Sequence, residues 1–310
     1  MSVNVKTAEY ENYGKCLVIS NGIIETYVTV DVGPRVIKAG LIGGTNVFWN
    51  DLNREMTKSG KLMDNTFYKG SAWNIYGGHR LWISPEHDCR SYYPDNDPVK
   101  YEITEKGAIF TPDPQKTVNV AHSIEIIMND DCTLSIIHHV KNISSKAKTF
   151  APWALSVLAP GGFEIIPQPQ TDTGLLGNRV LALWPYSNMA DNRVCWGKDY
   201  ITLKQDTNIE IPFKFGINNE FGWGAYILDD LLFVKRYNHN PDGTYPDFGV
   251  SYETYTNKYF LEAETLGELA DVASNETVSH TEIWEFIKVD DIPDPKDLSA
   301  VNEFVCKHIK

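Results

Sequence analysis

The sequence predicts an all-β protein built as one large antiparallel sandwich or barrel. Short segments rich in Val, Ile, Thr and aromatic residues alternate with turn residues along most of the 310-residue chain. Amphipathic helical periodicity is nearly absent, and no low-complexity linker divides the chain. Many strands without a dividing linker favour a single domain over residues 1–310.

The first strands are expected in the N-terminal third of the chain. Residues 16–33 read as two strands around Asn21-Gly22, a strong hairpin signal. Residues 34–51 continue with another strand and a Gly-Gly turn. The clearest hairpin spans residues 118–143, where two β-rich arms flank a polar Asn-Asp-Asp turn.

The second half of the chain carries the same strand pattern. Further strands are expected at 201–218, 222–228, 231–238, 258–266 and 280–289. Two Pro/Gly-rich stretches lie between strands and are expected to be loops; they are residues 159–174 and 240–249.

One helix is expected, in the C-terminal tail at about residues 296–309. Its apolar residues fall roughly on one helical face; they are Leu298, Val301, Phe304, Val305 and Ile309.

Composition and charge exclude several classes of protein. The net charge is 28 − 41 = −13 without any Lys/Arg run, so we expect no nucleic-acid partner. No apolar run approaches the ~20 residues of a membrane span, and the N-terminal segment lacks the apolar core of a signal peptide. Five scattered cysteines without CxxC spacing fit reduced thiols in a cytoplasmic protein with neither disulfides nor a zinc site.

Three segments together resemble the galactose mutarotase-like superfamily, which includes the aldose 1-epimerases. They are VTVDVGPRVIKAGLIGGTNVFWND (28–51), GGHRLWISPE (77–86) and KYFLEAETLGELADVASNETVSHTEIWEF (258–286). Each motif alone is weak, and their order and spacing carry the resemblance. It implies a large antiparallel β-supersandwich that acts on or binds a small-molecule sugar, as a monomer or homodimer. The epimerases of this superfamily interconvert the anomers of an aldose with one base and one acid.

Glu262 is the predicted base. In KYFLEAETL, strand alternation places Glu262 and Glu264 on one face. Two close carboxylates raise the pKa of one of them, which suits a base near neutral pH. The resemblance matches Glu262 to the catalytic glutamate of the superfamily. The alternative is that both glutamates are solvated on an exposed face.

His79 is the predicted acid, because histidine titrates near neutral pH. Arg80 is a predicted donor to sugar hydroxyls. If the segment is a strand, His79 and Arg80 point to opposite faces, and Arg80 shares its face with Trp82. A framework role for His79 and Arg80 remains an equal alternative. The superfamily's epimerases carry a second histidine on a mid-chain strand, but here Trp153 occupies that region, where it can stack on a sugar.

Four more residues complete the predicted site. Glu86 borders the GGHRLWISP stretch, and Lys235 interrupts an apolar strand, so Lys235 should face the pocket or pair with an acid. Tyr245 is a weaker loop candidate, and Glu264 accompanies Glu262. A metal ligated by the consecutive residues 86–88 is disfavoured, since neighbouring side chains diverge in a strand. No cofactor-binding fingerprint occurs, so no cofactor or metal is expected.

Two functions follow from these residues. The first is an aldose 1-epimerase-like isomerase with Glu262 as base and His79 as acid. The alternative is a non-catalytic carbohydrate-binding protein that keeps the sugar pocket. A lyase or hydrolase that uses the carboxylate pair is a third, weaker hypothesis.

Overall fold

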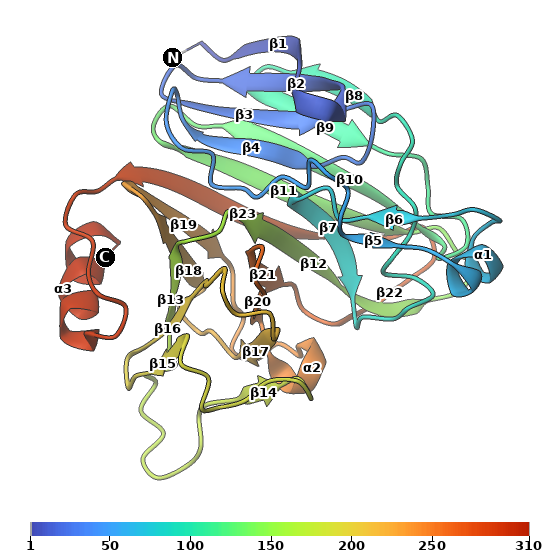
Figure 1. Ribbon diagram of the computed structural model, residues 1–310. Coiled ribbons are helices and arrows are strands. Elements are labelled where there is room, and N and C mark those ends of the chain that lie inside the picture. The colour runs from blue at the N-terminus through green and yellow to red at the C-terminus, as the bar shows by residue number, and fades with distance from the viewer. Residues whose placement is uncertain (1, 310) are drawn as a thin grey trace.

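Two large antiparallel sheets enclose one apolar core in the computed structural model, which describes residues 2–309 (Figure 1). Residues 1 and 310 of the predicted domain lie outside the described part. The first sheet has the strand order β1 (Asn4–Glu9), β2 (Lys15–Ser20), β3 (Ile24–Thr29), β4 (Val36–Leu41), β7 (Gly78–Ser84), β12 (Lys148–Leu158), β21 (Leu261–Leu266), β20 (Tyr252–Thr256), β17 (Phe213–Ile217) and β14 (Leu181–Leu183), with β22 (Ala270–Val272) paired to β12.

The second sheet covers the other side of the core. Its order is β15 (Val194–Trp196), β16 (Tyr200–Lys204), β13 (Phe163–Pro167), β18 (Trp223–Leu228), β19 (Leu231–Tyr237), β23 (Thr277–Lys288), β11 (Thr133–Asn142), β10 (Val120–Met128), β9 (Gly107–Thr111) and β8 (Lys100–Thr104). The smaller elements are the 3-10 turn η1 (Glu11–Tyr13), the β5–β6 pair (Thr57–Lys58, Trp73–Asn74), α1 (Lys61–Thr66), α2 (Pro246–Gly249) and α3 (Leu298–His308).

The predicted all-β sandwich is confirmed, and both predicted hairpins form. β2 and β3 pair around the Asn21-Gly22 turn, and β10 pairs with β11 over its whole length. The stretch 159–174 was expected to be a loop, but Phe163–Pro167 is a strand paired on both edges. Its apolar residues Phe163, Ile165 and Ile166 outweigh the flanking prolines and glycines, because both faces of the strand are buried.

The C-terminal helix α3 covers the outer face of the second sheet (Figure 1). Asp297 caps it by accepting hydrogen bonds from the backbone N–H groups of Ser299 and Ala300. The apolar face predicted from the sequence packs on β13 and β18 through Val301, Phe304 and Val305. None of the helices in the described part is long and apolar enough to cross a membrane.

Candidate functional site

A cavity of about 360 Å³, here called the central cavity, lies on the face of the first sheet that points away from the core. Strand alternation creates this face. On β21, Leu261 and Ala263 enter the core, whereas Glu262 and Glu264 line the cavity. The cavity is walled by Arg80 and Trp82 from β7, Trp153 and Leu155 from β12, Lys214 from β17 and Tyr255 from β20, together with Glu55, Met56, Thr57, Lys58, Trp73, Ile75, Glu86, Tyr92, Tyr186, Asn257 and Phe260.

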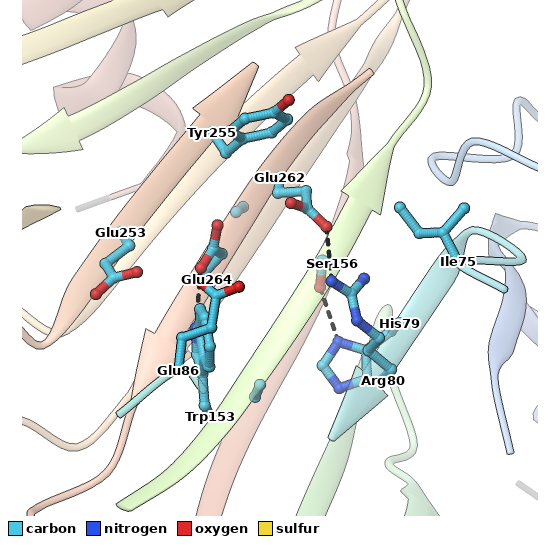
Figure 2. A network of polar contacts seen from close by, with 12 residues as sticks. Ile75, His79, Arg80, Glu86, Trp153, Ser156, Glu253, Tyr255, Glu262 and Glu264 are labelled. Carbon is cyan, nitrogen blue, oxygen red and sulfur yellow. Dashed lines mark hydrogen bonds and ion pairs between the residues drawn. The ribbon is translucent and has the colours of Figure 1, made fainter. Parts of the chain in front are cut away.

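Arg80 and Glu262 form the central ion pair of the cavity (Figure 2). Arg80 Nη2 donates to Glu262 Oε1 at 3.0 Å, and the guanidinium carbon lies 4.4 Å from the ring centroid of Trp82 and 5.5 Å from that of Trp73. Burial raises the pKa of Glu262, and the neighbouring Glu264 adds to this, while Arg80 opposes it. Glu262 is therefore a carboxylate that takes up a proton more readily than a solvated one.

A second ion-pair group lies beside the first. Lys214 Nζ contacts Glu253 at 2.7 Å and Glu264 at 3.0 Å, and Trp153 Nε1 donates to Glu264 at 2.9 Å. Burial alone would lower the pKa of Lys214, but the two carboxylates outweigh it and hold that pKa well above its usual value. Glu264 is thus held in place by one charged and one neutral donor.

Two donor groups of the cavity are buried without a partner. Arg80 is 3% exposed, and its Nε and Nη1 atoms have no hydrogen-bond partner among the described residues. Trp73 is 6% exposed, and its Nε1 also lacks a partner there. Buried donors are normally satisfied, so these unsatisfied N–H groups are exceptions in the cavity wall.

His79 does not face the central cavity, and the prediction that it does is wrong. Its side chain is wholly buried on the core face of β7, opposite Arg80. His79 Nδ1 lies 2.9 Å from Ser156 Oγ, and Nε2 lies 2.7 Å from Nε2 of His138 (Figure 2 shows the Ser156 contact). Burial lowers the pKa of His79 well below its ordinary value. The side chain therefore belongs to the contact between the sheets.

The hydrogen bonds determine the tautomers in this contact. His138 Nδ1 is 2.8 Å from the carbonyl oxygen of His280, so it carries the proton and Nε2 is an acceptor. His79 must then donate from Nε2 and accept from Ser156 at Nδ1. A neutral histidine with both nitrogens engaged in the core cannot protonate a sugar in the central cavity. His138 is likewise buried in the core.

Lys235 and Tyr245 also lie away from the central cavity. Lys235 is buried between the sheets, where Nζ contacts Glu282 at 3.0 Å and donates to the carbonyl of Ala263 at 2.8 Å. The acid partner expected from the sequence is therefore Glu282. Tyr245 accepts from the backbone N–H of Asn240 and stacks on His239.

The remaining predicted residues converge. Arg80, Trp82, Trp153, Glu262 and Glu264 all line the central cavity. Glu86 lies at its edge, where Tyr92 Oη donates to Glu86 Oε1 at 2.5 Å.

Sequence reasoning missed two important members of the site, Lys214 and Trp73. Lys214 interrupts the apolar run IPFKFGIN, as Lys235 does in LLFVKRYN, so the same signal was present. Trp73 comes from the short strand β6, outside the two sheets, and carries no periodic signal.

Possible metal ligands do not gather in the central cavity. Within residues 2–309, His79, His138 and Glu282 bring ligand atoms within 4.8 Å of one another. These atoms are already used, because the histidines bond to each other and Glu282 binds Lys235, Thr265 and Trp284. At 86–88, Asp88 pairs with Lys58, and His87 Nδ1 accepts from the backbone N–H of Cys89.

No protein-family model matches the sequence, and a search among curated proteins finds no significant relative. Solved structures do match. A galactose mutarotase-like protein from Lactobacillus casei aligns at a TM-score of 0.54 with 10% identity, over 88% of this chain and 100% of that one. A galactose mutarotase-like protein from Clostridium acetobutylicum aligns at 0.50 with 10% identity, over 93% and 99%.

A TPR-domain containing protein from Parabacteroides distasonis aligns at a TM-score of 0.59 with 13% identity over 91% of this chain. The chain spans only 48% of that protein. At these identities the likeness concerns the fold, and it confirms the architecture suggested by the three sequence motifs. The chain has the galactose mutarotase-like fold.

Proposed function

We propose that the protein binds an aldose in the central cavity and interconverts its anomers, with Glu262 as the base. The observation that carries this proposal is the Arg80–Glu262 pair, a base and a buried donor side by side in a cavity walled by indole rings. Aromatic faces suit the C–H surface of a sugar ring, and carboxylates with unpartnered N–H groups suit its hydroxyls.

In the proposed reaction, Glu262 removes the proton of the anomeric hydroxyl. The bond between C1 and the ring oxygen breaks, and that oxygen takes up a proton. The resulting aldehyde rotates about the C1–C2 bond, and the ring closes on the other face with the proton transfers reversed. The raised pKa of Glu262 favours this role, since a base works best when its pKa approaches the working pH.

In this proposal Arg80 has the role at the ring oxygen that was predicted for His79 from the sequence. Both reacting oxygens are bonded to C1, so a base and a donor that touch each other can contact both oxygens at once. In this arrangement Nε or Nη1 of Arg80 donates to the ring oxygen and stabilises the negative charge that develops there. Water that enters the open cavity supplies the proton.

The second candidate is a carbohydrate-binding protein without catalysis. One observation favours it: the predicted acid His79 is turned into the core. In the mid-chain region where the resemblance implies a second histidine, the sequence has Trp153. Binding requires only aromatic faces and hydroxyl partners, which the cavity walls offer.

Magnetisation-transfer NMR on a panel of aldoses distinguishes the two functions. We expect anomer exchange above the spontaneous rate for at least one aldose, and its loss in Glu262→Gln. Ligand shifts without accelerated exchange would instead support binding alone. If no aldose gave either signal, both functions would be refuted.

A further inference from the structure

A second hollow adjoins the central cavity. This outer compartment has a volume of about 340 Å³ and shares Glu86 and Trp153 with the central cavity. Its other walls include Asp88, Trp184 and Asp247. A ligand seated against Arg80 can therefore extend past Glu86 without leaving the protein surface.

The joined cavities have an excess of negative charge. Each of the three cations that line them is already paired; the pairs are Lys58 with Asp88, Arg80 with Glu262, and Lys214 with Glu253 and Glu264. Glu86 and Asp247 line the outer compartment, and neither forms an ion pair within residues 2–309. They receive hydrogen bonds only from neutral hydroxyls, those of Tyr92 and Ser84.

Glu86 and Asp247 in the outer compartment are hydrogen-bond acceptors, whereas the buried unpartnered groups of the central cavity are donors. Among the buried atoms of that cavity's lining, those without a partner within residues 2–309 are donors: Nε and Nη1 of Arg80 and Nε1 of Trp73. The carboxylate of Glu55 also lines the central cavity and has no ion pair in the same part of the chain. A ligand that satisfies both ends offers hydroxyl or ring oxygens to Arg80 and Trp73 and a donor to Glu86 and Asp247. A protonated amine is the strongest donor for two carboxylates.

We propose that the site selects its sugar by charge: it takes an aldose without an anionic group, and the outer compartment receives an amino substituent. A phosphate or carboxylate on the sugar would be repelled by the negative charges of Glu86 and Asp247. No cation in the lining would be free to bind it, because each is already paired with a carboxylate. This inference rests on the proposed sugar-binding function and adds the class of sugar to it. A hydrogen bond to a charged group changes affinity by about tenfold or more, which sets the expected preference.

The test is titration calorimetry with a matched series of ligands. The series contains a hexose, its 2-amino-2-deoxy and 6-amino-6-deoxy forms, the N-acetylated form of each, and the hexose 6-phosphate. We expect one amino form to bind about tenfold more tightly than the parent hexose, and the phosphate to bind more weakly. Acetylation should remove the gain at the position that carries it, because it removes the charge.

Asp247→Asn isolates the outer compartment. Asp247 has a left-handed backbone with φ of 50°, which Asn also tolerates, so the change removes charge with little strain. We expect this variant to lose most of the preference for the amine while it keeps its affinity for the parent hexose. Glu102→Gln, on the edge strand β8 of the other sheet, removes an equal charge elsewhere and should change nothing.

Each result bears on the proposal. Equal affinity for the hexose and both amino forms would refute the amine subsite, and tight binding of the phosphate would refute selection by charge. If no member of the series bound, the proposed sugar-binding function itself would fail, which separates the two failures.

Discussion

Arg80 and Glu262 show how two side chains set each other's properties in a buried place. Burial raises the pKa of Glu262, and Glu264 raises it further, while Arg80, which donates to one of the carboxylate oxygens, lowers it. The ring of Trp82 supports the guanidinium from its face, so the fork keeps one orientation. The proposed base and its donor are thus preorganised before any sugar arrives.

Removing the positive charge of Arg80 should raise the pKa of Glu262 further. Arg80→Leu takes away the largest of the interactions that lower this pKa, and it leaves burial and Glu264, which raise it. The pH at which Glu262 loses its proton should therefore move upward, and exchange at neutral pH should slow. A ¹³C NMR titration of labelled glutamate checks the shift, with Glu262→Gln to assign the signal. An unchanged or lower pKa would contradict this account.

The sequence predicted the positions of some site residues correctly and those of others wrongly. Alternation in KYFLEAETL correctly placed Glu262 and Glu264 on one face, because period two is a property of any strand. The same alternation separated His79 from Arg80, but it could not tell which face was core, since a sheet covered on both sides offers no exposed face. Trp73 reaches the site from outside the sheets, and only the tertiary fold brings it there.

At the scale of elements, β7 serves two purposes with neighbouring residues. Its core face carries His79 to Ser156 and His138, and its cavity face carries Arg80 to Glu262. The strand therefore connects the contact between the sheets to the candidate site, and substitutions on the two faces should have different consequences.

His79→Gln should destabilise the protein without weakening sugar binding. The change disrupts a buried hydrogen-bond pair with His138, which costs on the order of 1–3 kcal/mol when one partner is left unsatisfied. Urea denaturation measures the free energy of unfolding, and titration of the folded variant measures sugar affinity. A variant of normal stability that no longer binds sugar would place His79 in the site after all.

The cap of α3 offers a second test at this scale. Asp297→Ala removes the side chain that accepts from Ser299 and Ala300, so the free energy of unfolding should fall by about 1 kcal/mol. Asp297→Asn is the matched control, because Asn is an equally good cap. Thermal unfolding followed by circular dichroism checks both variants; equal loss in the two would show that charge, and not the cap, matters.

In the whole molecule, the contact between the two sheets includes several buried polar groups. Besides apolar side chains it contains the neutral histidines His79, His138 and His280 and the buried pair of Lys235 with Glu282. Burial lowers the pKa of His138 and of His280 to about 3, and that of His122, in the second sheet, to about 4. Folding therefore depends on these histidines staying uncharged.

The protein should lose stability as the pH falls below about 6.5, the ordinary pKa of histidine. Below that pH the histidines of the unfolded chain bind protons, whereas the buried histidines of the folded state stay neutral. Each histidine therefore lowers the free energy of unfolding by up to about 1.4 kcal/mol per pH unit, until the pH reaches its pKa in the folded state. Urea denaturation at several pH values between 7.5 and 5 measures the slope. His122→Phe should reduce this slope, because it removes one of the titrating histidines. His122 Nε2 has no hydrogen-bond partner among the described residues, so the substitution breaks no hydrogen bond at that atom. Constant stability over this range would contradict the account.

The whole fold was predictable from few signals: turn residues between β-rich segments indicated the sandwich, and three motifs suggested the mutarotase-like architecture. The strand at Phe163–Pro167 was missed because the prolines and glycines around it indicate a loop more strongly than Phe163, Ile165 and Ile166 indicate a strand. Its burial depends on neighbours that are distant in sequence, β16 and β18.

In the proposed reaction Arg80, and not His79, works with Glu262. The most direct test uses an aldose whose anomer exchange the wild-type protein accelerates. The exchange rate of that aldose is measured with Arg80→Lys and with His79→Gln. Arg80→Lys keeps the charge but loses the planar fork, so we predict a rate at least about 100-fold lower, as for the loss of a donor to a developing oxyanion. His79→Gln should retain the wild-type rate per folded molecule. Loss of exchange in His79→Gln with a normal rate in Arg80→Lys would contradict the account.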